Sequence, residues 1–309
     1  MGWFVGVDAG SFSCKVALLG ENGVAQALTV PAGTDYARAG RHGFERILER
    51  AGLRSEDVAA VVATGVGAGR IDFARERTGE VICTARGIAA VAPEVRTVID
   101  VGAQSTRVIW LDETGRVAHF VANEKCATGS GRFLQVIANV LRVRLEEVGP
   151  LSLRAEHPVT FTTGCAVFGE SEAITRVSEG AAKEDILAGV HRSLAEKIAS
   201  LVRTRGLQGR YAVCGGGALD VGLLRCVEEE LGAPPLVPAD PEVVGAVGAA
   251  VQARRAARTA MEAGAGPMER DRRPPRATSR PGRMPPARPR PAPPVGMGER
   301  RGVKGGETR

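Results

Sequence analysis

Two copies of one strand-rich pattern constrain most strongly what this chain of 309 residues can fold into. In the first copy, apolar β-prone segments at 4–7, 16–19 and 23–30 precede a helical pattern at 36–50, and a further buried strand is predicted at 58–63. Short turns between consecutive strands favour hairpins, and the following helix would cover one face of their sheet. This order of elements is typical of an α/β unit.

The same order of elements returns in the second half of the chain. Strands are predicted at 97–101, 106–111 and 116–121, and helical patterns begin near Arg132 and Ala166. A block of three strands followed by a helix that occurs twice indicates two related α/β halves.

The pattern after these blocks completes the second half. A helix is predicted at 185–202, where apolar residues recur at helical spacing and would face a core. A strand at 211–214, a helix at 218–231 and a last helix from Pro241 follow, and proline suits a first helical turn.

Composition separates a folded part from a tail. Residues 254–309 carry 15 Lys and Arg against 5 Asp and Glu, with ten of the eighteen prolines, so this segment cannot collapse around an apolar core. We expect a first subdomain at 1–95 with a returning helix at 241–256, a second subdomain at 96–240, and a disordered Arg- and Pro-rich tail at 257–309.

Charge and hydropathy limit the classes of partner. Residues 1–253 carry 26 Lys and Arg against 30 Asp and Glu, so the folded part is mildly acidic and a nucleic-acid partner is not expected. No apolar stretch of about 18 residues occurs, so neither membrane spanning nor secretion is expected and we place the protein in the cytoplasm. The basic tail is read either as a solvated extension or as a polybasic arm.

Three glycine-containing turns each follow an apolar strand, and two of these strands end in aspartate. Glycine lets backbone N–H groups approach phosphates, and carboxylates at the strand ends could hold Mg²⁺ through its waters. None of the turns is a Walker A loop. The candidate residues around these turns are Asp8, Gly10, Ser11, Ser13, Lys15, Asp100, Gly102, Gln104, Gly215, Gly216 and Gly217.

Two cysteines stand just ahead of predicted helices. Cys126 precedes a segment with Gly129 and Gly131, and Cys165 precedes the helix at Ala166. The positive end of a helix lowers a thiol pKa and stabilises an anionic cluster, but a [4Fe–4S] cluster usually takes four thiolates. A second subunit would supply the other two. The alternative is that both cysteines are small buried hydrophobes, as we expect for the remaining four cysteines.

These features resemble known ATPases. The three turns resemble those of the actin, sugar-kinase and heat-shock-protein superfamily, which implies two ribonuclease-H-like domains with ATP and Mg²⁺ in the cleft. Both cysteine segments and the sequence at 189–193 resemble the BadF/BadG/BcrA/BcrD ATPase family. That family comprises activators of 2-hydroxyacyl-CoA dehydratases and ATPase subunits of benzoyl-CoA reductases.

The resemblance implies an ATP-driven electron donor. One [4Fe–4S] cluster would bridge two subunits through residues such as Cys126 and Cys165, and Asp8, Asp100 and Gln104 would serve ATP hydrolysis. The glycines around the phosphates, with Gly129 and Gly131, would bind the cofactors. Reduced ferredoxin or flavodoxin would supply electrons, and an acyl-CoA reductase or dehydratase would receive them.

One loop departs from the pattern of the dehydratase activators, which commonly read Asp-x-Gly-Gly-Gln-Asp. This chain has Ala103 and Ser105 at the fourth and sixth of these positions. The loop resembles that of the smaller ATPase chain of a benzoyl-CoA reductase, so a heterodimer with a homologous chain stands beside a homodimer. A small-molecule kinase and a regulatory protein without turnover are the alternative functions.

Overall fold

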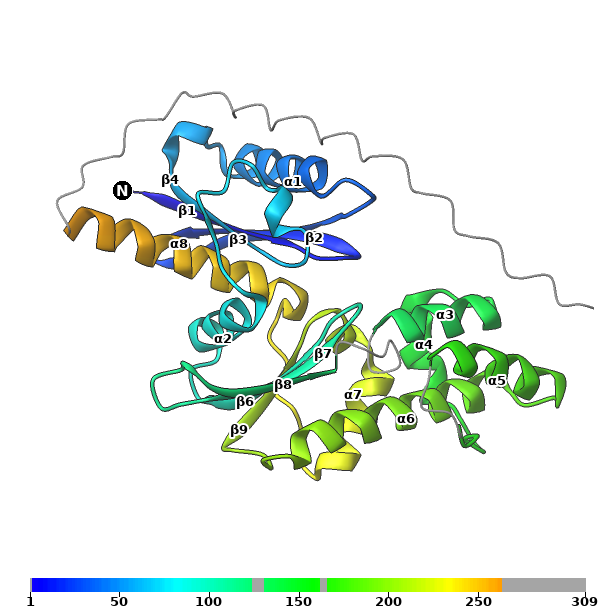
Figure 1. Cartoon of the computed structure of the whole chain (residues 1–309). Helices are drawn as coiled ribbons and strands as arrows, with labels where there is room; N and C mark the ends of the chain where they lie inside the picture. The colour runs from blue at the N-terminus through cyan, green and yellow to red at the C-terminus, as the bar shows by residue number, and fades with distance from the viewer. Residues whose placement is uncertain (1, 124–130, 162–165, 263–309) are drawn as a thin grey trace, which may run out of the picture. The chain divides into compact units, whose positions relative to one another are not determined.

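The computed structural model describes residues 2–123, 131–161 and 166–262, drawn in colour in Figure 1. Cys126, Gly129 and Cys165 therefore lie outside the described residues, as does most of the predicted tail. No described helix combines the length and the apolar character that crossing a membrane requires.

The first sheet is built from the N-terminal hairpins. Strands β1 (Trp3–Ala9), β2 (Ser13–Gly20) and β3 (Gly23–Pro31) pair antiparallel, while β4 (Val58–Thr64) runs parallel to β1 and the short β5 (Glu76–Arg77) extends the edge. The strand order is β3-β2-β1-β4-β5. All the strands predicted in this half are present, and only β5 was not anticipated.

Helix α1 (Tyr36–Ala51) covers one face of this sheet, as its apolar spacing predicts. The Asp35 side chain accepts a hydrogen bond from the N–H of Arg38 at its start, and Gly52 ends it in the left-handed conformation at φ 65°. Its buried residues pack on the apolar face of the sheet, and together they form one core.

The second sheet repeats the arrangement of the first. Strands β6 (Val95–Val101), β7 (Thr106–Leu111) and β8 (Val117–Asn123) pair antiparallel, and β9 (Arg210–Cys214) runs parallel to β6. The order β8-β7-β6-β9 matches β3-β2-β1-β4 of the first sheet position by position. The predicted α/β fold with a repeated strand pattern is confirmed.

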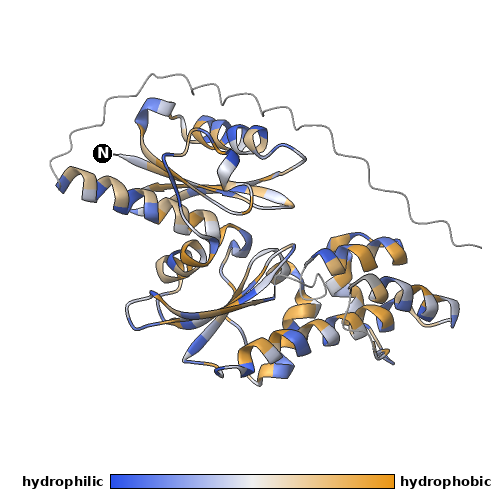
Figure 2. Cartoon of the chain, viewed as in Figure 1, coloured by the Kyte–Doolittle hydropathy of each residue, from blue (hydrophilic) through white to orange (hydrophobic). Residues whose placement is uncertain are grey.

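Five helices gather around one face of the second sheet: α3 (Gly131–Leu141), α4 (Leu145–Ser152), α5 (Ala166–Ser178), α6 (Lys183–Arg203) and α7 (Val221–Leu231). Figure 2 shows apolar and polar residues interleaved along these helices, which is the pattern of helices buried on one side. Four of the five were predicted. The fifth, α4, is short and contains a proline, so its helical pattern is weak.

Two helices join the two sheets. Helix α2 (Glu80–Val91) packs on the second sheet, and α8 (Val244–Glu262), which follows the 3₁₀ turn η5 (Pro241–Val243), packs on the first. The two helices also pack on each other (Figure 1). Helix α8 extends to Glu262, into the segment predicted as tail, and the proposed subdomain limits stay a prediction.

Glycines allow α2 and α8 to approach closely. A Cβ added at Gly248 of α8 would lie 1.7 Å from the carbonyl oxygen of Cys83, and one added at Gly87 of α2 would lie 2.0 Å from the carbonyl oxygen of Val244. Both obstacles are backbone atoms and cannot rotate away. The junction of the two sheets therefore depends on these two glycines.

Substitution of Gly248 by alanine is expected to lower the free energy of unfolding by roughly 1–3 kcal/mol, because the helices must separate to admit the methyl group. Gly69→Ala is the matched control, since a Cβ at Gly69 meets no atom within 4 Å. Urea denaturation of both variants measures the difference. Equal stability of the two variants would show that the junction yields without cost.

Candidate functional site

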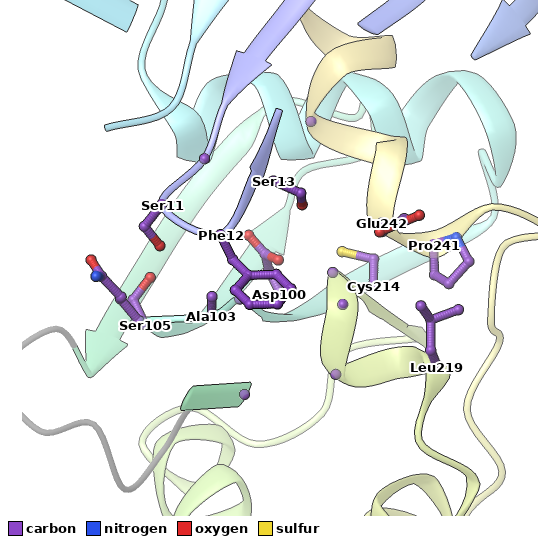
Figure 3. A pocket seen from close by; sticks show the side chains of 18 of the residues that line it. Ser11, Phe12, Ser13, Asp100, Ala103, Ser105, Cys214, Leu219, Pro241 and Glu242 are labelled. Carbon is purple, nitrogen blue, oxygen red and sulfur yellow. The ribbon is translucent and has the colours of Figure 1, made fainter. Parts of the chain in front are cut away.

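A pocket of about 460 Å³ lies where the predicted glycine turns of both sheets meet. Every predicted site residue that the structure describes lines it: Asp8, Gly10, Ser11, Ser13, Lys15, Asp100, Gly102, Gln104, Gly131, Gly215, Gly216 and Gly217. Figure 3 shows Ser11 and Ser105 at one side of the pocket and Leu219 and Pro241 at the other. Segments more than 200 residues apart in the chain are thus brought to one cavity.

The turn between β1 and β2 supplies a cation beside a carboxylate. Asp8 and Lys15 are partners in the antiparallel register, and Lys15 Nζ lies 3.7 Å from Asp8 Oδ2. A Cβ at Gly10 would come within 2.9 Å of the Ser13 carbonyl oxygen and 3.0 Å of Lys15 Nζ, so this turn is closed too tightly for a side chain. It therefore presents backbone and a lysine to the cavity, which suits an anion.

The hairpin of β6 and β7 supplies a second carboxylate with its own cation. Asp100 pairs in register with Arg107, whose Nη1 lies 3.6 Å from Asp100 Oδ2 and whose Nη2 donates to Glu80 Oε2 at 2.8 Å. The hydroxyl of Thr84 donates to Asp100 Oδ2 at 3.4 Å. Residues 84 and 80 come from α2, so three elements hold this carboxylate.

Sequence reasoning missed Arg107, Glu80 and Thr84. Arg107 was within reach, because the tight turn of residues 102–105 fixes the hairpin register and places residue 107 opposite Asp100. Nothing local in the sequence could have placed Glu80 and Thr84, because α2 reaches the pocket only through packing between distant elements.

The two aspartates are electrostatically suited to a bound cation. Burial raises the pKa of Asp8, which Lys15 lowers and Asp100 raises further. Burial also raises the pKa of Asp100, and Arg107 opposes that change. Carboxylates that repel each other in a buried pocket are stabilised as anions by a divalent cation.

The donor set fits hydrated Mg²⁺ rather than a fully protein-coordinated metal. Among the described residues, no group of three or more His, Cys, Asp or Glu side chains could hold a metal ion together. Mg²⁺ commonly keeps several waters and takes one or two carboxylates plus phosphate oxygens. Asp8 and Asp100 meet that requirement once a phosphate ligand occupies the pocket.

The third turn follows β9 and presses on the end of β6. Gly215 has φ 82°, and a Cβ there would lie 2.6 Å from the Val101 carbonyl oxygen and 2.7 Å from Asp100 Oδ1. Gly217 is also pressed against Val101, whereas no atom lies within 4 Å of a Cβ at Gly216. Two glycines thus permit the close approach, and the third leaves open space beside the cavity.

The start of α3 is bonded directly to the second turn. The N–H of Gly131 donates to the carbonyl oxygen of Gly102 at 2.9 Å, and the N–H of Arg132 donates to that of Ala103 at 2.9 Å. Two amides at the start of α3 are therefore committed to the pocket loop. The sequence interpretation had assigned the unpaired amides of this helix to a cysteine thiolate, and these two do not serve that role.

The helices that follow the two predicted cysteine segments pack against each other. A Cβ at Gly169, in the first turns of α5, would lie 2.7 Å from two ring carbons of Phe133, near the start of α3. The absence of a side chain at residue 169 lets the two helix starts come together. The chain thus brings the ends of both cysteine segments to one region.

The other four cysteines behave as the hydrophobic interpretation predicts. Cys14, Cys83 and Cys214 are buried, and Cys226 is partly buried. Burial raises the pKa of the Cys14 thiol to about 12, and those of Cys83 and Cys226 to about 11. Cys214 lines the pocket, and its pKa is also raised by burial. These thiols stay protonated and are poor metal ligands.

A model of the BadF/BadG/BcrA/BcrD ATPase family matches residues 5–253, which include both sheets and every described candidate residue. The chain belongs to this family. The resemblance drawn from the cysteine segments and glycine turns is therefore confirmed.

Relatives in this family include a 2-hydroxyisocaproyl-CoA dehydratase activator of Clostridioides difficile, 39% identical over 81% of this chain and 94% of the relative. One of the subunits of benzoyl-CoA reductase from Thauera aromatica is 35% identical over 70% of this chain and 79% of the relative. A solved structure of the activator of the 2-hydroxyisocaproyl-CoA dehydratase from Clostridium difficile, with bound ADPNP, has a TM-score of 0.80 at 36% identity. It covers 84% of this chain and 97% of its own, and the predicted superfamily fold is confirmed.

Proposed function

We propose that this protein is an ATP-hydrolysing iron–sulfur activator or subunit that delivers low-potential electrons to an acyl-CoA reductase of the benzoyl-CoA reductase type or to a 2-hydroxyacyl-CoA dehydratase. One observation carries the proposal: the pocket loop with Gly102 and Ala103 is hydrogen-bonded to the first residues of α3, the helix that follows the Cys126 segment. A nucleotide that moves this loop acts on the residues beside a cluster ligand.

The pocket would bind ATP with Mg²⁺ through the groups already described. Lys15 and the backbone around Gly10 and Gly102 would hold the phosphates, and Asp8 and Asp100 would hold the waters of Mg²⁺. The ADPNP in the solved relative supports a nucleotide of this class. Mg²⁺ would supply charge neutralisation at the transferring phosphate.

Hydrolysis requires a water aligned with the terminal phosphate. We assign that role to Gln104, which lines the pocket next to the second phosphate loop and whose amide both donates and accepts hydrogen bonds. Ser11, Ser13 and Gly216 would complete the phosphate contacts from the other turns. Ala103 lines the same pocket, so the methyl group that distinguishes this loop stands at the cavity itself.

Cys126 and Cys165 would each supply one thiolate to a [4Fe–4S] cluster, which provides a one-electron carrier when bound. Four thiolates require two subunits, so the protein would work as a homodimer or as a heterodimer with a homologous chain. The contact between Gly169 and Phe133 supports this assignment, since it brings together the helices that follow the two cysteine segments. Gly129 and Gly131 would let the Cys126 segment approach the cluster closely.

Reduced ferredoxin or flavodoxin would load the protein with an electron, and the acyl-CoA enzyme would accept it. Both exchanges place the protein in the cytoplasm, where such carriers and coenzyme A thioesters are found. The tail outside the described residues has no assigned part in either exchange.

Anaerobic purification with iron, sulfide and ATPase measurements tests this function. We expect about four irons and four sulfides per dimer, which is the content of one shared cluster, together with ATP hydrolysis. An anaerobic preparation that binds ATP but holds no iron would exclude electron transfer. ATP binding with iron but without turnover would instead favour the regulatory alternative.

A further inference from the structure

His191 of α6 is fully buried and joins three helices beside the pocket. Its Nδ1 lies 2.9 Å from Ser152 Oγ at the end of α4, and its Nε2 lies 3.1 Å from Asp220 Oδ2 at the start of α7. Ser152 Oγ also donates to the carbonyl oxygen of Gly149 at 2.9 Å. With that hydroxyl hydrogen directed at Gly149, the ring donates to Ser152 and to Asp220.

The backbone around His191 leaves no room for a different arrangement. A Cβ at Gly222 would lie 2.1 Å from Ser152 Oγ and 2.6 Å from His191 Nδ1, and a Cβ at Gly149 would lie 2.6 Å from Asp220 Oδ1. Asp220 Oδ1 meanwhile accepts from the N–H groups of Gly222 and Leu223, which caps α7. Each oxygen of Asp220 therefore has a fixed partner.

This network fixes two walls of the pocket relative to each other. Gly149 and Pro150 of α4 line one wall, and Leu219 and Asp220 line the other. Ser152 is on the same helix as the first wall, and His191 connects it to the second wall through Asp220. The separation of the walls therefore depends on the two hydrogen bonds of one imidazole ring.

The space between these walls suits a planar apolar group. Leu145 of α4 and Leu219 are 41% and 60% exposed, which leaves apolar surface uncovered at this end of the pocket. Figure 3 shows Leu219 across the pocket from Ser11 and Ser105, which belong to the phosphate turns. A nucleotide with its phosphates at those turns would extend its base toward Leu219.

We propose that His191 is a positioning residue for the nucleoside: it sets the width of the slot between α4 and the 216–219 turn and so determines the affinity for ATP. The proposal rests on nucleotide binding in this pocket. Because His191 is on the far side of Asp220 from the cavity, it acts through the walls and does not touch the nucleotide. It should therefore change binding of ATP more than the hydrolysis of bound ATP.

The test replaces His191 with phenylalanine, which keeps a planar ring and removes both hydrogen bonds. We expect the Kd and KM for ATP to rise on the order of tenfold, the size expected when buried partners are left unpaired, while kcat stays within about threefold. His42→Phe is the matched control, because His42 is exposed on α1. Calorimetric titration with ATP and steady-state phosphate release provide the three constants.

Ser152→Ala removes one of the two bonds and should shift Kd in the same direction by less; it decides the question if the phenylalanine variant does not fold. Unchanged ATP affinity, or a lower kcat at unchanged KM, would overturn the proposal. Wild-type protein that does not bind ATP would instead overturn the proposed function, so the two failures are distinguishable.

Discussion

Replacing Cys165 with alanine is expected to abolish iron binding by the anaerobically purified protein. A bridging cluster that loses one thiolate from each subunit keeps only two of its four ligands, and two thiolates do not hold a [4Fe–4S] cluster across a dimer interface. ATP affinity should stay within about twofold of the wild-type value, since distant sites are usually independent in binding energy. Iron content, cluster absorbance and ATP titration measure the three quantities.

Cys226→Ala is the matched control for that substitution. Cys226 is a partly buried thiol on α7, and the pKa of its thiol is raised by burial, so the protein should keep its full iron content when this residue is replaced. Retention of iron and cluster absorbance in the Cys165 variant would exclude Cys165 as a ligand. Loss of iron in the control would show that the cysteines were assigned wrongly.

Replacing Asp100 with asparagine is expected to lower ATP turnover by about 10- to 100-fold, the range seen when groups that orient a bound metal are removed. The change keeps the shape of the side chain and removes one of the two carboxylates that face the cation. It also leaves Arg107 with a weaker partner at 3.6 Å, although Glu80 still accepts from its other nitrogen at 2.8 Å. Steady-state phosphate release at saturating Mg²⁺ and ATP measures the effect.

Asp72→Asn provides the comparison for the Asp100 substitution. Asp72 pairs with Arg41 at 2.7 Å with a side chain that is 71% exposed, and it lies outside the pocket lining. Its replacement should leave turnover unchanged, because exposed ion pairs contribute little. Equal turnover in both variants would remove Asp100 from the metal site.

The phosphate-binding part of the site was predictable because its signal is local. A glycine turn after an apolar strand identifies both the strand end and the backbone that faces the ligand, and all described residues predicted in this way line one pocket. The α3 and α5 helices were predicted from apolar spacing alone. Their mutual packing through Gly169 and Phe133 was not, since it depends on tertiary contacts.

The misses have equally specific physical causes. Helix α7 begins at Val221 rather than at residue 218, because Asp220 caps it and the preceding residues form a 3₁₀ turn. Helix α2 carries Gly87 and several β-branched residues, which weaken its helical signal, although Gly87 permits its contact with α8. Residues chosen for a close contact therefore obscured the local pattern.

His191 illustrates a limit of a different kind. The sequence interpretation classed all four histidines as surface or structural residues, because their spacings suggested no metal site. The fold places His42 and His157 at the surface and buries His191 between Ser152 and Asp220. These partners lie 39 and 29 residues away, so no periodic pattern connects them.

The bond from Gly102 to Gly131 implies that nucleotide state reaches the cluster region. The most direct measurement is the rate at which an iron chelator removes iron from the anaerobically purified protein, with and without Mg²⁺ and ATP. A change of about tenfold or more on adding ATP is predicted, because a loop bonded to α3 at two amides cannot move without moving that helix start. Equal rates of iron removal in both conditions, with ATP shown to be bound, would contradict the coupling of nucleotide and cluster.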